Sequence, residues 1–181
     1  EDQSGSTAIP RPHQAKEVAM YFKQSDLFSG MDHGFVKAIM AKAEKITYRT
    51  GDIIFREGDE TRYFYILTKG HVKLRIGRDE HTVYVLNRAG ECFGWSSLIE
   101  RPHFSASAIC AATTSLMRLD KTEVRTIMKA NPGNGLIFME RMAGMIGDRL
   151  LRCYAALTSP ALLDLDPAAG TGQLQEALEV V

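Results

Sequence analysis

Hydrophobic and polar positions divide the chain into a helical front part, a β-rich centre and a helical back part. Helical spacing of apolar residues predicts a short helix over 13–22 and a second over 32–44, which Asp32 can cap. Residues 46–119 consist of short runs rich in aromatic and β-branched residues, separated by glycines or charged turns. This second pattern is typical of antiparallel strands, so the predicted fold is mainly β with flanking helices.

The strands of the central part are predicted from how apolar residues are spaced within each run. The first run is apolar throughout, as in a strand buried on both faces, and the next alternates between apolar and polar positions. Residues 77–80 are polar and join two runs, which predicts a hairpin. Many short antiparallel strands at this spacing indicate a barrel, a jelly roll or a sandwich. The predicted strands are Tyr63–Leu67, Val72–Ile76, His81–Leu86, Ser105–Cys110 and Ser115–Leu119.

Two further helices are predicted after the strands. Asp120 and Glu123 have the spacing of an N-cap and its reciprocal partner, which predicts a helix ending near Ala130. The sequence Asn131-Pro132-Gly133 is expected to stop that helix, and a longer helix is predicted over 134–157.

The long helix has two apolar stripes. One follows gaps of three and four residues, which is the heptad spacing of helices that pack along their length. This stripe can face the chain's own core or a second subunit. The other stripe, Phe138, Met142 and Met145, is expected to face the strands, which favours a homodimer through Leu136–Leu157. The heptad stripe consists of Leu136, Met139, Ala143, Ile146, Leu150, Cys153 and Leu157.

The organisation predicted is a leader with a short helix over 1–26, one domain over 27–157 and a tail over 158–181. Lys and Arg (22) balance Asp and Glu (22), which disfavours a dedicated nucleic-acid binder. The 24 residues after Leu157 contain no Lys or Arg, so we expect no DNA binding by this chain alone. No apolar run is long enough for a membrane span and no secretory leader is visible, so a cytoplasmic location is expected.

Cysteines and histidines give no metal-binding pattern. The three cysteines, Cys92, Cys110 and Cys153, are far apart in sequence, and the histidines lack ligand spacing. No motif with a catalytic mechanism is present either. We therefore expect neither a metal site nor an enzyme.

Gly94 begins the segment with the most informative chemistry. A glycine frees the backbone for a sharp turn, and residues 95–99 have room for a single helical turn before Pro102. The first N–H groups of such a turn, together with the hydroxyls of Ser96 and Ser97, can bind an anion such as phosphate.

Three stretches around this turn resemble the cyclic nucleotide-binding sensor domain of the CRP/FNR regulators. They are Tyr48–Asp59, Tyr65–Leu74 and Gly90–Gly94. The resemblance covers roughly residues 27–157. It implies a double-stranded β-helix (jelly roll) with a phosphate-binding cassette at 94–107 and a long C-terminal helix that dimerises near the ligand. Glycines stand where that family turns its strands: Gly51, Gly58, Gly70, Gly90 and Gly94.

The cassette departs from the family at two positions. Trp95 stands where the family has a Glu that binds the ribose, and Phe104 stands where it has an Arg that pairs with the cyclic phosphate. Loss of two such bonds would weaken a cyclic nucleotide roughly 10²–10⁴-fold. The candidate effector-binding residues are Phe93, Gly94, Trp95, Ser96, Ser97, His103, Phe104, Ser105 and Ala106.

Three interpretations of the cassette remain open. Cyclic AMP or cyclic GMP can still bind, through the turn's N–H groups, the serines and His103 or Arg101. The pocket can instead accept a small effector that is apolar or planar, or its aromatic rings can fill it and leave a dimeric scaffold. Haem, with His71, His81, His103 or a cysteine as axial ligand, is a further alternative. In each case a protein partner could receive the signal.

Overall fold

Two four-stranded antiparallel sheets form the centre of the molecule. The computed structural model describes residues 25–78 and 81–158. One sheet has the strand order β1-β8-β3-β6 and the other β2-β7-β4-β5. The strands are β1 (Glu44–Tyr48), β2 (Ile53–Phe55), β3 (Tyr63–Lys69), β4 (Val72–Ile76), β5 (His81–Leu86), β6 (Cys92–Phe93), β7 (Ser107–Cys110) and β8 (Thr114–Asp120).

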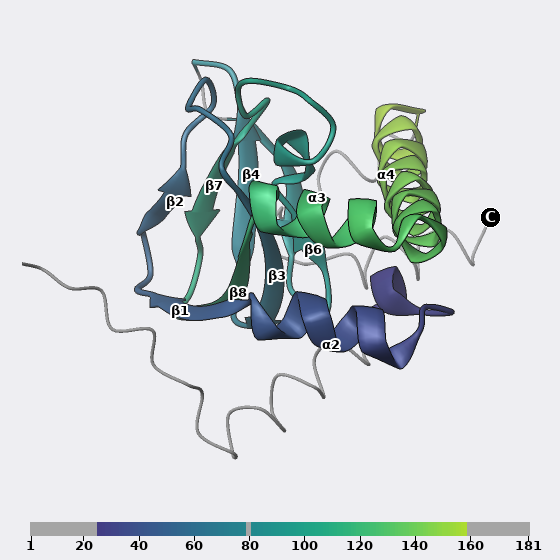
Figure 1. Cartoon of the computed structure of the whole chain (residues 1–181). Coiled ribbons are helices and arrows are strands. Elements are labelled where there is room, and N and C mark those ends of the chain that lie inside the picture. The colour runs from purple at the N-terminus through teal and green to yellow at the C-terminus, as the bar shows by residue number, and fades with distance from the viewer. Residues whose placement is uncertain (1–24, 79–80, 159–181) are drawn as a thin grey trace, which may run out of the picture.

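Helices cover one side of the sheets. The α-helices are α2 (His33–Ala41), α3 (Lys121–Ala130) and α4 (Pro132–Thr158), and two 3-10 turns are η1 (Asp26–Phe28) and η2 (Trp95–Ser97). In Figure 1, α4 lies on the opposite side of the molecule from β2. Phe138 and Met142 of α4 are buried in a core that also contains Phe64 and Leu119. The second stripe of the long helix therefore faces the sheets, as predicted.

A second core lies between the two sheets and contains four buried aromatic rings among the ten described residues that are buried in it. Tyr65 and Phe93 stack with ring centroids 5.1 Å apart, and Phe55 and Phe104 stack at 3.8 Å. Such pairs stabilise a fold by about 0.5–1.5 kcal/mol beyond the area that they bury. This core supports the cassette from the interior of the jelly roll, and the predicted fold class is confirmed.

The predicted hairpin has the predicted bounds. Val72–Ile76 and His81–Leu86 pair antiparallel, with Val72 opposite Leu86. The runs predicted at 63–67, 105–110 and 115–119 are strands whose ends differ by one or two residues. The structure adds β1, β2 and β6, which are too short or too polar to stand out as separate runs.

The bounds of two helices differ from the prediction by two or three residues. Helix α2 ends at Ala41 rather than at 44, because Glu44 already pairs with Arg118 in the first sheet. Helix α4 begins at Pro132, not at 134, because Gly135 donates a backbone hydrogen bond to the carbonyl of Asn131 at 2.9 Å. Proline is well suited to the first position of a helix, where no N–H is needed.

Of the three side chains predicted to cap α2 and α3, one caps its helix as predicted and two have other partners. Asp32 precedes α2 but makes no capping bond; its carboxylate accepts a hydrogen bond from the amide of Asn134 at 2.8 Å. Asp120 does cap α3, accepting from the N–H of Thr122 at 2.8 Å. Its expected partner Glu123 instead forms an ion pair with Lys42 at 3.0 Å.

The predicted helix over 13–22 and the predicted tail lie outside the described residues, and the domain boundaries stay predictions. Across the ranges 25–78 and 81–158, no helix combines the length and the apolar character that crossing a bilayer requires.

Candidate functional site

Gly94 turns the chain out of β6 into η2. Its φ of 75° lies in the left-handed region that favours glycine. A Cβ at this position would lie 3.0 Å from the ring of Tyr65 and 3.1 Å from the carbonyl oxygen of Tyr63. A side chain at Gly94 would therefore strain the backbone and collide with β3.

The one-turn helix predicted after Gly94 is present as η2, and its bonds close the turn on itself. The N–H and the hydroxyl of Ser97 both donate to the carbonyl of Gly94, at 3.1 and 2.8 Å. The N–H of Leu98 donates to the carbonyl of Trp95 at 2.8 Å. Ser97 is thus committed within the turn, whereas Ser96 lines the adjacent cavity.

The cavity beside the turn is small. Its free space is about 40 Å³, about three times the roughly 10–15 Å³ that one water molecule needs and far below the roughly 300 Å³ of a small-molecule site. Phe104 is only 5% exposed and stacks on Phe55 at an interplanar angle of 13°, so these rings occupy most of the space. The cavity is lined by Phe55, Leu74, Gly94, Trp95, Ser96, Phe104, Ser105 and Ala106.

Most of the predicted site residues come together at this cavity. Three predicted members are placed elsewhere. Phe93 is buried in the core between the two sheets, and Ser97 points back to its own turn. His103 is exposed and forms an isolated β-bridge with Glu60, so its imidazole is not among the residues that line the cavity.

Arg149 of α4 completes the surroundings of the turn. Its guanidinium lies 4.5 Å from the ring centroid of Trp95 and 4.0 Å from that of Tyr84. Its Nη2 donates to the carbonyl of Cys92 at 3.1 Å, while its buried Nε and Nη1 find no hydrogen-bond partner among the described residues. The arginine thereby joins α4 to the cassette through β6 and η2.

The electrostatics of this contact follow from burial. Burial lowers the pKa of Arg149 and raises the pKa of the Cys92 thiol to about 12, so the thiol stays protonated and unreactive. The carboxylate of Glu91 is close by and is held by the hydroxyl of Tyr84 at 3.0 Å and by the N–H of Arg88 at 2.8 Å.

Arg149 is not among the residues predicted from the sequence. A signal was available, because the stripe Phe138, Met142 and Met145 continues by four residues to Arg149. A cation at the end of an apolar stripe places its charge against the same surface as the stripe.

Two antiparallel sheets that enclose a glycine-initiated turn, with a long helix packed against that turn, define a jelly-roll sensor domain. Comparison with known proteins agrees with this class. Residues 45–131 match the model of the cyclic nucleotide-binding domain. Over these residues the chain is similar to the cyclic nucleotide-binding domain family.

Relatives of known name include regulators and channels. The chain is 28% identical over 131 residues to the cyclic AMP receptor protein of Thermus thermophilus, covering 71% of this chain and 58% of that protein. It is 27% identical over 154 residues to the cyclic nucleotide-gated channel beta-1 of Bos taurus, covering 83% of this chain but 11% of the channel. A cyclic nucleotide-binding domain from Methylobacillus flagellatus has the same fold, with a TM-score of 0.68, 18% identity and coverage of 79% and 82%. These similarities support a ligand-sensing regulatory domain.

Proposed function

We propose that this chain is the sensor part of a regulatory protein that acts as a homodimer. In this proposal, a small effector entering at the cassette displaces Trp95 or Phe104, and α4 carries the change to a second subunit. A ligand can shift such an equilibrium only by binding one arrangement better than the other. The proposal therefore requires a physical contact between the cassette and α4.

The contact of Trp95 with Arg149 carries the proposal. The guanidinium is sandwiched against two aromatic rings, where cation–π attraction contributes about 0.5–2 kcal/mol. Two of its nitrogens are buried and have no partner in the described part of the chain, which is costly. Movement of Trp95 would remove one of the two aromatic contacts of Arg149. An arrangement in which the unpaired nitrogens of Arg149 gain a hydrogen-bond partner would then be favoured, and because Arg149 belongs to α4, that change would act on α4 directly.

An uncovered apolar face on α4 supports the homodimer. Within the described residues, Leu150, Leu151 and Tyr154 are 47%, 64% and 54% exposed, and Leu136 near the start of the helix is also exposed. Single exposed apolar residues are common, but several along one helix indicate an interaction surface. Leu136, Ala143 and Leu150 of the predicted heptad stripe are exposed, whereas Met139 and Ile146 pack against the chain's own core. A second α4 lying along the exposed side of the helix would cover it.

The effector of this proposal is not held by charge at the cassette. The cavity lining contains no cationic side chain, and the two family positions are aromatic. We therefore expect cyclic AMP and cyclic GMP to bind weakly to the native chain, and a small apolar or planar molecule to suit the lining better.

A dimeric scaffold that binds no effector is the second candidate. The stacked rings of Phe55 and Phe104, which leave only about 40 Å³ free, favour it. The two candidates differ in whether occupancy of the cassette changes the dimer.

The test uses the double variant Trp95→Glu with Phe104→Arg, which restores the family's two charged residues. Calorimetric titration with cyclic AMP is needed, because the variant removes the only tryptophan. We expect affinity to rise roughly 10²-fold or more over the native chain, with Trp95→Glu alone as the matched control. Sedimentation equilibrium of the single variant Phe104→Arg, which keeps the contact of Trp95 with Arg149, then gives the dimer dissociation constant with and without cyclic AMP. A shift supports the sensor, whereas binding with an unchanged constant supports the scaffold.

The dimer itself is tested by a charge on the exposed face of α4. Leu150→Glu should dissociate the dimer, because a carboxylate would have to be buried in an apolar interface. Ile53→Glu on β2 is the control, since Ile53 is comparably exposed (37%) and lies on the other side of the molecule. If both variants remain dimeric, α4 is not the interface.

A further inference from the structure

A second and larger space, a cleft, lies next to the Phe55–Phe104 pair, whose rings also line the cassette cavity. Its free space is about 260 Å³, several times that of the cassette cavity. Phe55 and Phe104 line both spaces and therefore form the wall between them. We call the larger space the tyrosine cleft; it is lined by Tyr48, Ile54, Phe55, Asp59, Glu60, Arg62, Tyr63, Tyr65, Phe104 and Arg118.

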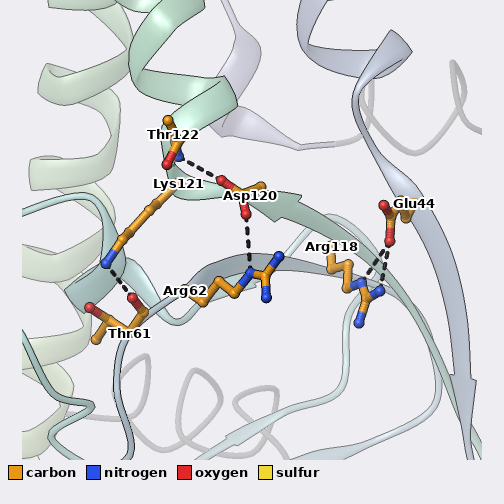
Figure 2. A network of polar contacts seen from close by, with 7 residues as sticks. All are labelled: Glu44, Thr61, Arg62, Arg118, Asp120, Lys121 and Thr122. Atoms are coloured by element: carbon orange, nitrogen blue, oxygen red, sulfur yellow. Dashed lines mark hydrogen bonds and ion pairs between the residues drawn. The ribbon is translucent and has the colours of Figure 1, made fainter. Parts of the chain in front are cut away.

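Two arginines at this cleft are held from behind by carboxylates. Arg118 binds the same oxygen of Glu44 through Nε and Nη2, each at 2.8 Å, and Arg62 binds Asp120 at 3.3 Å. Figure 2 shows both pairs, which link the inner strand β8 to the edge strand β1 and to the residue before β3. Both guanidinium groups lie over the ring of Tyr63, at 4.5 and 5.0 Å from its centroid. The half-buried Arg118 is therefore held beside the ring, whereas the side chain of Arg62 is 70% exposed.

The charges around the cleft disfavour an anionic ligand. The lining holds two cations, Arg62 and Arg118, and two carboxylates, Asp59 and Glu60, so its own charges balance. The two arginines also pair with carboxylates outside the lining, which makes them less able to bind an anion. A cation is disfavoured by the guanidinium of Arg118, which is close to the ring faces that would attract it. The balance of charge therefore favours a neutral ligand.

The cleft offers both kinds of hydrogen-bonding group beside aromatic surfaces. Burial raises the pKa of Tyr65 and of Tyr48, so both hydroxyls stay protonated at neutral pH and can donate. The carboxylates of Asp59 and Glu60 can accept. One oxygen of Asp59 already accepts from the N–H of Arg56 at 2.7 Å, which orients the carboxylate and leaves the other oxygen for a ligand.

We propose that the tyrosine cleft binds an uncharged planar heteroaromatic ligand that carries both hydrogen-bond donors and acceptors. The ring would lie against Tyr48, with its donors toward Asp59 and its acceptors toward Arg118. This site is separate from the cassette, so the inference goes beyond the proposed function and can fail without it.

The test uses adenine as the probe, because it is neutral, planar and has both kinds of group. Binding is measured by calorimetry and by ligand-observed NMR on the native chain. Asp59→Ala and Asp52→Ala form a matched pair, since each carboxylate accepts a backbone N–H three residues earlier at 2.7 Å but only Asp59 lines the cleft. Both variants lose the same turn contact, so a difference between them reports the ligand.

We expect Asp59→Ala to weaken adenine about tenfold and Asp52→Ala to leave it nearly unchanged. Benzoate, a planar anion, should bind at least about tenfold more weakly than adenine. Absence of adenine binding to the native chain, equal effects of the two variants, or tighter binding of benzoate would overturn the proposal. Weakening by the cassette variant Ser96→Ala but not by Asp59→Ala would place the ligand in the cassette and also overturn it.

Discussion

Phe104 determines whether the cassette is open or filled, and its replacement by alanine is the most informative perturbation. The ring is 5% exposed and stacks on Phe55 at 3.8 Å. Burial of a phenylalanine contributes about 1.5–3 kcal/mol and an aromatic stack about 0.5–1.5 kcal/mol. We therefore expect Phe104→Ala to lower the free energy of unfolding by about 2–4.5 kcal/mol, within the range of other buried aromatic truncations.

The assay is urea unfolding followed by circular dichroism, with Ile99→Ala as the control. Ile99 is 36% exposed, so its truncation should cost less than about 1 kcal/mol. The enlarged cavity is lined mainly by apolar groups, so benzene should bind to Phe104→Ala and restore part of the lost stability. A loss below about 1 kcal/mol for Phe104→Ala, or no effect of benzene, would refute the conclusion that this ring fills the cassette.

Three further perturbations test the contacts that hold the cassette and α3 in place. Asp120→Ala should cost about 1 kcal/mol in thermal unfolding, because it removes the cap of α3. Burial would raise the pKa of Asp120, but hydrogen bonds from Thr122 and Arg62 outweigh it, so the pKa is lowered. The free energy of unfolding should therefore fall as pH drops through the folded-state pKa of Asp120. Asp120→Ala should reduce this pH dependence. Gly94→Ala should destabilise by about 1–3 kcal/mol in urea, because of the positive φ and the collision with β3. Arg149→Met keeps the length of the side chain but removes the buried charge; it should shift the emission of the tryptophan, and unchanged emission would argue against the contact.

Patterns within single elements predict most of this fold. The hairpin of β4 and β5 is predicted with correct bounds because its strands alternate regularly and a polar turn separates them. The end of α2 is not predicted, because Glu44 pairs with Arg118, which is 74 residues away in sequence. Tertiary pairing overrides local helical preference at such positions.

The site shows the same limit. Gly94 and the one-turn helix after it follow from local sequence, since a glycine with positive φ begins the turn. The inward position of Phe104 depends on Phe55 from another strand, and the contact of Arg149 depends on the register of α4 against β5 and η2. Neither arrangement can be predicted without the packing of the two sheets.

The central claim, that the cassette is coupled to α4, is tested most directly by the dimer dissociation constant of Trp95→Ala. Trp95 belongs to η2 and not to the exposed face of α4, so its removal can affect the dimer only through contacts such as that with Arg149. We expect sedimentation equilibrium to show a dissociation constant about 2- to 30-fold different from that of the native chain. A native dimer whose dissociation constant is the same in Trp95→Ala would contradict the account.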